Sequence, residues 1–208
     1  MIKVEDLGKN NQLDISAFAG ITGNFKIVIQ GNNNVLKIGA ATTLKNGIIE
    51  MRNHNSNIEI GEACVLSGEF RFRADNSYLF IGSETTMQSV KITLHEAGVI
   101  SIGEDCMFSG DIRMDVSDMH SILDIATMKR INPPEDIKIG DHVWVGQGVY
   151  ILKGVTIASH SIIGAKALVT KDIPAHSIAV GIPAKVIKTG VTWDRQRLPF
   201  DDSLSFND

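Results

Sequence analysis

An aliphatic residue recurs at every sixth position between residues 137 and 169, and this period constrains the fold more than any other feature. The positions are Ile139, Val145, Ile151, Ile157, Ile163 and Val169. Six is neither the helix period of about 3.6 nor the strand period of about 2, but it is three strand periods, so every sixth side chain points the same way. Short repeats of fixed length are typical of a β-helix, in which the chain turns a corner after each unit. We therefore predict an all-β stack of coils.

A longer repeat precedes this stretch. Ile-Gly pairs begin at Ile38, Ile60, Ile81 and Ile102, separated by 22, 21 and 21 residues. A regular coil of three six-residue sides needs 18 residues, so we expect about three extra residues in each looser coil, at corner bulges or longer turns. Parallel β connections are right-handed in nearly all folds, so the period itself does not predict a left-handed coil.

Residues 117–136, SDMHSILDIATMKRINPPED, interrupt both repeats. This segment is polar, contains two prolines and is too long for a corner, and long loops on a rigid scaffold are often functional. We predict one domain over residues 1–208. It comprises a lead-in (1–24), looser coils (25–116), this excursion loop (117–136), strict hexapeptide coils (137–188) and a tail (189–208).

The bulk composition excludes several classes of partner. The net charge of −4 provides no basic excess for nucleic acid. We find no apolar leader and no run long enough to span a membrane, so we expect no transmembrane segment and a cytoplasmic location. No metal is predicted, because no His/Cys/Asp/Glu cluster has ligand spacing. Cys64 and Cys106 should share a column with one coil between them, roughly 10 Å apart, which is too far for a disulfide.

The stretch IGDHVWVGQGVYILKGVTIASHSIIGAKALVTKDIPAHSIAVGIPAKVIK resembles the hexapeptide-repeat acyltransferases. The motifs VWVG, VTKDIP and GIPAKVI carry the resemblance, together with the step at Ile163-Gly164-Ala165, and the match is dense over 137–188. It implies a left-handed parallel β-helix, a homotrimer with sites between subunits, and acyl-CoA as donor. The pairing of SDMHSILD with GDHVWVG resembles the branch that O-acetylates sugars, including capsular polysaccharide and sialate O-acetyltransferases.

In that branch a His in the DMH-type loop and a Trp in the VW step form the active site, and they match His120 and Trp144. An imidazole could take the proton of an attacking sugar hydroxyl, a step that contributes about 10²–10⁴ in rate. Asp118, Asp124 or a backbone carbonyl could orient the ring. The alternative is an ordinary solvated surface histidine.

We expect Trp144 on the outer surface, because an indole is too large for most inward positions of an 18-residue coil. It would form a wall for the acetyl thioester, with an N–H near the developing oxyanion; the alternative is packing between subunits. His142 is the second candidate for catalysis. The remaining histidines are interpreted as structural or solvated: His54, His95, His160 and His176.

The resemblance also implies a set of residues that contact acetyl-CoA. These are Gln147, Ala165, Thr170, Lys171, Lys185 and Lys188. Small residues would let the pantetheine arm approach the backbone, and the lysines would pair with phosphates as point charges where the family often has Arg. For any single lysine the alternative is a solvated surface charge.

Arg71, Arg73, Lys91 and Arg113 lie at similar phases of successive coils. We expect Arg71 and Arg113 to share a column with Thr93 between them. This pattern suggests an anionic acceptor such as a sialic or uronic acid, and it is equally typical of a solvated outer face.

These features together predict an O-acetyltransferase that moves acetyl from acetyl-CoA to a hydroxyl of a sugar, on a capsular or other surface polysaccharide or its precursor. Attack would be direct, because no Ser or Cys near His120 has the setting of a nucleophile. Two alternatives stay open: an N-acetyltransferase acting on an amino sugar, and a non-catalytic β-solenoid that only assembles or binds.

Overall fold

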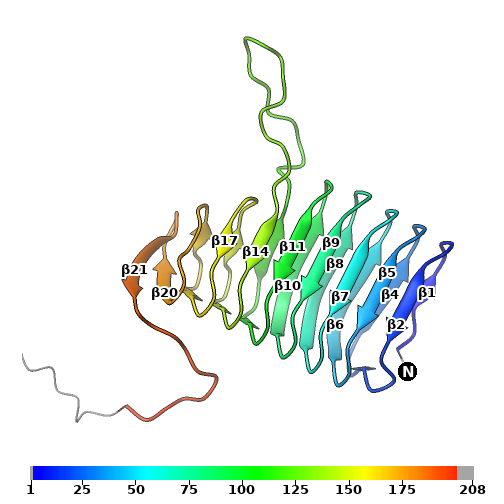
Figure 1. Cartoon of the computed structure of the whole chain (residues 1–208), viewed down its shortest axis with the longest axis horizontal. Coiled ribbons are helices and arrows are strands. Elements are labelled where there is room, and N and C mark those ends of the chain that lie inside the picture. The colour runs from blue at the N-terminus through cyan, green and yellow to red at the C-terminus, as the bar shows by residue number, and fades with distance from the viewer. Residues whose placement is uncertain (1, 201–208) are drawn as a thin grey trace, which may run out of the picture.

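The structure is a computed structural model that describes residues 2–200, and these residues form a stack of flat, three-sided coils (Figure 1). Within this range all strand pairs are parallel except at the C-terminal end, where β21 (Lys185–Thr189) folds back antiparallel on β20 (Ser177–Val180). No helix in residues 2–200 has the length and apolarity that a bilayer crossing requires. Residues 201–208 of the predicted tail, and Met1 of the predicted lead-in, lie outside the described residues.

Three faces make up the stack. Face 1 is a seven-stranded sheet of β2 (Gln12–Ile15), β5 (Val35–Ile38), β7 (Asn57–Ile60), β9 (Tyr78–Ile81), β11 (Val99–Ile102), β14 (Ile137–Ile139) and β17 (Thr156–Ile157). Face 2 contains β3 (Gly20–Ile21), β12 (Met107–Phe108), β15 (Trp144–Val145), β18 (Ile162–Ile163) and β20, with the first halves of β6 (Thr43–Met51), β8 (Val65–Phe72) and β10 (Thr86–Leu94). Face 3 contains β1 (Glu5–Asp6), β4 (Phe25–Ile29), β13 (Ile112–Asp115), β16 (Tyr150–Ile151) and β19 (Leu168–Val169), with the second halves of β6, β8 and β10.

Strand register confirms the two repeat lengths. Ile139 pairs with Ile157, so a strict coil has 18 residues. In the first part of the chain Ile38 pairs with Ile60, and Ile60 with Ile81, so the looser coils have 22 and 21 residues. The prediction of about three additional residues in each looser coil is therefore confirmed.

The additional residues gather at the corner between face 3 and face 1. The buried columns of these two faces are eleven positions apart in a looser coil, from Phe70 to Ile81, and six positions apart in a strict coil, from Ile151 to Ile157. The loop 117–136 leaves the stack at the same corner, between β13 and β14, and projects away from it (Figure 1). The loop is therefore an extension of a corner that the preceding coils already widen.

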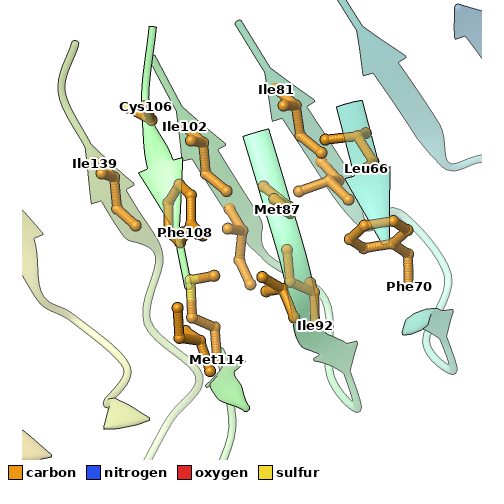
Figure 2. Packing of buried hydrophobic residues seen from close by; sticks show 14 of the residues in the cluster. Leu66, Phe70, Ile81, Met87, Ile92, Ile102, Cys106, Phe108, Met114 and Ile139 are labelled. Atoms are coloured by element: carbon orange, nitrogen blue, oxygen red, sulfur yellow. The ribbon is translucent and has the colours of Figure 1, made fainter. Parts of the chain in front are cut away.

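Inward-facing side chains of the three faces fill the prism. Phe70, Ile92 and Met114 stack in one column through successive coils, and Leu66, Met87 and Phe108 stack in the next (Figure 2). All six are at most 2% exposed. Each such burial contributes about 1.5–3 kcal/mol relative to exposure, so the core holds the stack rigid beneath the loop.

Two small features of the stack follow directly from close coil spacing. A Cβ on Gly82 would lie 2.5 Å from the carbonyl carbon of Gly103, which explains the glycine of each Ile-Gly pair. Cys64 and Cys106 are buried and free in one column, with Thr85 between them, as predicted. Burial raises the pKa of the Cys106 thiol to about 12.

Candidate active site

The loop 117–136 presents His120 at the corner between face 3 and face 1. Its backbone folds into a narrow antiparallel arm, with Leu123 bridged to Arg130 and the Ile131 N–H donating to the carbonyl of Ile122. Six apolar side chains of the arm are exposed by 43–92%: Met119, Ile122, Leu123, Ile125, Met128 and Ile131. The arm therefore presents an exposed apolar surface at this corner of the stack.

A buried asparagine joins the two strands of the arm beside His120. Asn132 is 7% exposed, and its Nδ2 donates to the His120 carbonyl at 2.8 Å and to Asp118 Oδ2 at 2.9 Å. Its Oδ1 accepts from the Ile122 N–H at 2.7 Å and from Arg130 Nε at 3.1 Å. The amide thus uses both donors and both acceptors, and it fixes the backbone on each side of His120.

Asp118, His120 and Asn132 lie at the base of the arm, which we call the neck. Two ion pairs hold the neck to the stack. Lys153, on the following coil, donates to Asp118 Oδ2 at 2.5 Å and to the Pro133 carbonyl at 2.8 Å. Hydrogen bonds from Lys153 and Asn132 hold the pKa of Asp118 below its usual value. On the preceding coil, Glu96 accepts two bonds from Arg130 at 2.6 Å.

Neither candidate orienter bonds the His120 imidazole. Asp118 accepts from Lys153 and Asn132, and Asp124 accepts from the N–H and Oγ1 of Thr127. Among residues 2–200 the His120 ring makes no hydrogen bond, and the side chain is exposed. The ring is therefore held through its backbone and is open to an incoming group.

Trp144 lies on face 2 and points outward, as predicted. It pairs with Met107 and Ile162 of the adjacent coils, and its side chain is 37% exposed. Its indole ring lies 6.2 Å from that of Trp193 at an angle of 51°. Since His120 projects from the corner between faces 3 and 1, a single chain places the two predicted catalytic side chains on different sides of the prism.

The other histidines have structural partners, with His142 the most completely bonded. Its Nδ1 lies 2.6 Å from Asp105 Oδ2 and its Nε2 lies 2.9 Å from the Trp193 carbonyl, so neither nitrogen is free for catalysis. His95 pairs with Asp115, and His54 Nδ1 accepts from a backbone N–H. His160 and His176 stack face to face at the corner between faces 1 and 2. Within residues 2–200 no group of three His, Cys, Asp or Glu side chains could hold a metal ion.

The six predicted cofactor residues are all exposed and fall into three places. Gln147 and Ala165 stack on successive coils at the corner between faces 2 and 3. Thr170 and Lys171 follow β19 at the next corner. Lys185 and Lys188 lie on β21, paired with Val180 and Ile178 of face 2.

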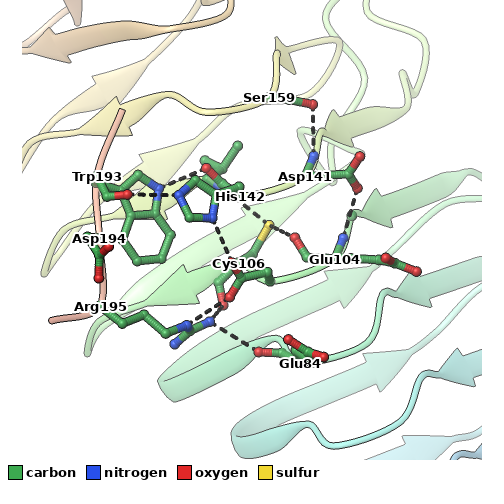
Figure 3. Close-up of polar contacts among 12 residues, drawn as sticks. Glu84, Glu104, Cys106, Asp141, His142, Ser159, Trp193, Asp194 and Arg195 are labelled. Atoms are coloured by element: carbon green, nitrogen blue, oxygen red, sulfur yellow. Dashed lines mark hydrogen bonds and ion pairs between the residues drawn. The ribbon is translucent and has the colours of Figure 1, made fainter. Parts of the chain in front are cut away.

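Sequence reasoning missed Asn132. It named Trp193, Arg195 and Arg197 in the tail but left open whether they cap the coil, reach a neighbour or touch CoA. A tail segment, residues 190–195, runs back along the corner between faces 1 and 2, where Trp193 is 8% exposed and Arg195 pairs with Asp105 at 2.8 Å (Figure 3). The only sequence signal was an isolated Trp beside basic residues in a polar tail.

A parallel stack of hexapeptide coils with one long, histidine-bearing loop defines a class of transferases. The family model described as bacterial transferase hexapeptide (six repeats) matches residues 136–171. A polysialic acid O-acetyltransferase of Neisseria meningitidis is 33% identical over 91% of this chain and 88% of its own length. The chain belongs to the hexapeptide-repeat O-acetyltransferases, enzymes with a left-handed β-helix.

Solved structures agree with this assignment. The polySia specific acetyltransferase NeuO superposes with a TM-score of 0.86 at 34% identity, covering 93% of this chain and 89% of its own. The polysialic acid O-acetyltransferase OatWY gives 0.91 at 29% identity, covering 97% and 96%. A polysialic acid O-acetyltransferase of Escherichia coli O1:K1 / APEC is 38% identical over 61% of this chain, but this match spans only 42% of the relative's length.

Proposed function

We propose that this protein transfers the acetyl group of acetyl-CoA to a hydroxyl of an acidic glycan, a sialic acid-containing capsular or surface polysaccharide or its precursor. The observation that carries the proposal is the similarity to the Neisseria meningitidis polysialic acid O-acetyltransferase over 91% of the chain, because it includes the loop, face 2 and the C-terminal coils together. The agreement of the backbone with OatWY and NeuO supports it.

In the proposed reaction His120 acts as general base. Its imidazole takes the proton of the sugar hydroxyl as the oxygen attacks the thioester carbonyl, so the C–O bond forms before the C–S bond breaks. The imidazolium then returns the proton to the departing CoA thiolate. Trp144 is proposed to wall the thioester, with an N–H placed toward the oxyanion. The imidazole of His120 suits this role because, within residues 2–200, no side chain forms a hydrogen bond with it.

A homotrimer would complete the site. One chain keeps His120 and Trp144 on different sides of the prism, so the arm of one subunit must approach face 2 of the next to bring them together. The exposed apolar arm supports this arrangement, because Ile125 is 92% and Met128 67% exposed. Cyclic association buries the same patch in every subunit and leaves none uncovered.

Acetyl-CoA would lie along the C-terminal coils of this shared site. Gln147, Ala165 and Thr170 would accept the pantetheine arm, and Lys171, Lys185 and Lys188 would pair with the phosphates. All six are exposed at the end of the stack that carries Trp144. Because acetyl-CoA is an intracellular metabolite, we place the reaction in the cytoplasm.

The charge of face 3 supports an anionic acceptor. Glu50 is 7% exposed and pairs with three arginines, Arg52 at 2.8 Å, Arg71 at 2.9 Å and Arg73 at 3.0 Å. Burial raises the pKa of Glu50, but the hydrogen bond from Arg52 and the charges of Arg73 and Arg71 outweigh it and keep the pKa below its usual value. Glu69 pairs with Arg71 at 3.1 Å and with Lys91 at 3.5 Å. Two carboxylates thus sit among four cations, which leaves local positive charge in a chain of net charge −4.

The predicted alignment of the arginines on this face is wrong in detail. Arg71 shares its column with Glu50, Thr93 and Asp115, whereas Arg113 lies in the neighbouring column with Lys91. The positive charge therefore follows two adjacent columns.

Acetyl transfer to a panel of glycans tests the proposal, with polysialic acid, a neutral glycan and an amino sugar as acceptors. Wild-type protein should produce an alkali-labile ester on the sialic acid polymer, and His120→Ala should lower kcat about 10²- to 10⁴-fold with the trimer intact by light scattering. An alkali-stable amide would favour the N-acetyltransferase alternative. Absence of transfer to every acceptor would favour the non-catalytic solenoid.

A further inference from the structure

The tail segment 190–195 closes over one corner of the stack, next to Trp144. The Val191 N–H donates to the His176 carbonyl at 3.1 Å, and Arg195 donates to Thr86 Oγ1 at 3.0 Å and to the carbonyl of Glu84 at 3.1 Å. These contacts of the tail run from the coil of His176 to the coil of Glu84, four coil spacings away. The groove beneath it has a volume of about 840 Å³.

Trp193 and His142 form a reciprocal pair at the centre of this contact (Figure 3). Trp193 Nε1 donates to the His142 carbonyl at 2.8 Å, and the Trp193 carbonyl faces His142 Nε2 at 2.9 Å. The two rings stack with centroids 4.3 Å apart and planes 14° apart. The Trp193 ring is also a neighbour of the Trp144 indole, with centroids 6.2 Å apart.

The His142 ring lies between two oxygen atoms. Asp105 Oδ2 and the Trp193 carbonyl oxygen are both acceptors. Burial raises the pKa of Asp105, but hydrogen bonds from Arg195 and His142 outweigh it and keep the pKa below its usual value, so Asp105 is a carboxylate. These two contacts fix the orientation of the ring beside the tail.

Charged groups surround His142. Glu104, Asp105, Asp141 and Asp194 line the same groove. Arg195 pairs with Asp105, and the His160 ring lies 5.2 Å from that of His142.

We propose that Trp193 and His142 are positioning residues for acetyl transfer: His142 clasps the tail, and the clasped Trp193 holds the Trp144 indole in place. This inference rests on the proposed function for its kinetic consequence and on geometry alone for the clasp. Loss of the His142 ring removes the stacking partner of Trp193 and the contact with the Trp193 carbonyl, so the tail should detach and Trp144 should lose its neighbour.

Fluorescence of Trp193 tests the clasp without any substrate. Trp144→Phe leaves Trp193 as the sole tryptophan of the chain. Because Trp193 is 8% exposed, acrylamide should quench its emission poorly. Adding His142→Asn removes the ring and keeps a residue suited to the left-handed corner at φ 53°, so the emission should shift to the red and acrylamide quenching should rise. Unchanged emission and quenching in that double variant would refute the clasp.

Kinetics and circular dichroism test the positioning. Trp193→Ala should lower kcat about 10- to 100-fold with little change in the KM for glycan. Arg197→Gln is the control, because Arg197 is an exposed charge two positions beyond Arg195, and its kcat should stay within about twofold of wild type. The exciton couplet of the two indoles should weaken in His142→Asn, which keeps both tryptophans. Wild-type kcat in Trp193→Ala, or an unchanged couplet in His142→Asn, would overturn the positioning role. Wild-type protein that acetylates no glycan, with the fluorescence response of the clasp present, would overturn the proposed function alone.

Discussion

Replacing Asn132 by Ala separates the placement of His120 from its chemistry. The change removes four hydrogen bonds at the neck of the arm, two donated and two accepted. Asp118 keeps Lys153 as a partner, whereas the His120 carbonyl and the Ile122 N–H lose the bonds that fix them. Each neutral bond contributes about 0.5–1.5 kcal/mol net, so the ordered neck loses about 2 kcal/mol.

This loss should appear in activity and hardly in global stability. A cost of about 2 kcal/mol lowers the equilibrium constant for ordering the arm about 30-fold, and kcat should fall by up to that factor. The core beneath contains no part of the arm, so the melting temperature should shift little, as for other local openings. Steady-state acetyl transfer and thermal unfolding, measured on the same samples, give the two numbers.

Two further variants make this test specific. Thr127→Ala, in the same arm, removes one side-chain hydrogen bond to Asp124 far from the neck and should leave kcat within about twofold. Asn132→Asp would place a second carboxylate at the 2.9 Å contact with Asp118 and should be worse than Asn132→Ala. If Asn132→Ala keeps wild-type kcat while His120→Ala loses it, the neck does not position the base.

The neck and the core make two more predictions. Hydrogen bonds from Arg130 and Ser117 lower the pKa of Glu96 from its usual value near 4.5 to about 2. The stability that the Glu96–Arg130 ion pair contributes is therefore complete above pH 4.5 and is lost as pH falls toward 2. Carboxyl-carbon NMR of Glu96 should show no titration above pH 4. Burial raises the pKa of both Cys64 and Cys106, so a thiol reagent at pH 8 should label neither in native protein and both after denaturation, and rapid native labelling would contradict their burial.

The period of six was enough to predict the scaffold. Inward aliphatics, the two coil lengths and the shared column of Cys64 and Cys106 all follow from side chains that repeat in step with the coil. The outward position of Trp144 followed from its size. These predictions succeed because a solenoid makes residues distant in sequence equivalent by a fixed offset.

Predictions fail where that offset changes. Between β8 and β10 the offset is 21 residues at the start of face 2 and 22 on face 3, because the register shifts between Met87 and Val90; between β6 and β8 it is 22 and then 21. A count that misses this shift moves a residue to the wrong column or the wrong side of the strand, which is why Arg71 and Arg113 were misaligned. Asn132 and Trp193 act on partners 12 and 51 residues away, outside any repeat, and no periodic signal marks them.

The separation of the two catalytic candidates within one chain makes a quantitative prediction about assembly. His120 projects from the corner between faces 3 and 1, and Trp144 lies on face 2 beside the tail clasp, so a shared site takes each from a different subunit. His120→Ala and Trp144→Ala should each be nearly inactive alone. If they are mixed after dissociation and reassembled at equal ratio, a site is complete when its arm comes from a Trp144→Ala chain and its face 2 from a His120→Ala chain.

Random assortment makes the probability of that combination one half times one half, so the whole reassembled population should recover about one quarter of wild-type activity per site. Mixing either variant with itself is the matched control and should recover none. A site built within a single chain would give no activity at any ratio, because every chain in the mixture lacks one of the two side chains. Activity near one quarter at equal ratio, falling symmetrically on either side, would therefore assign the arm and face 2 to different subunits.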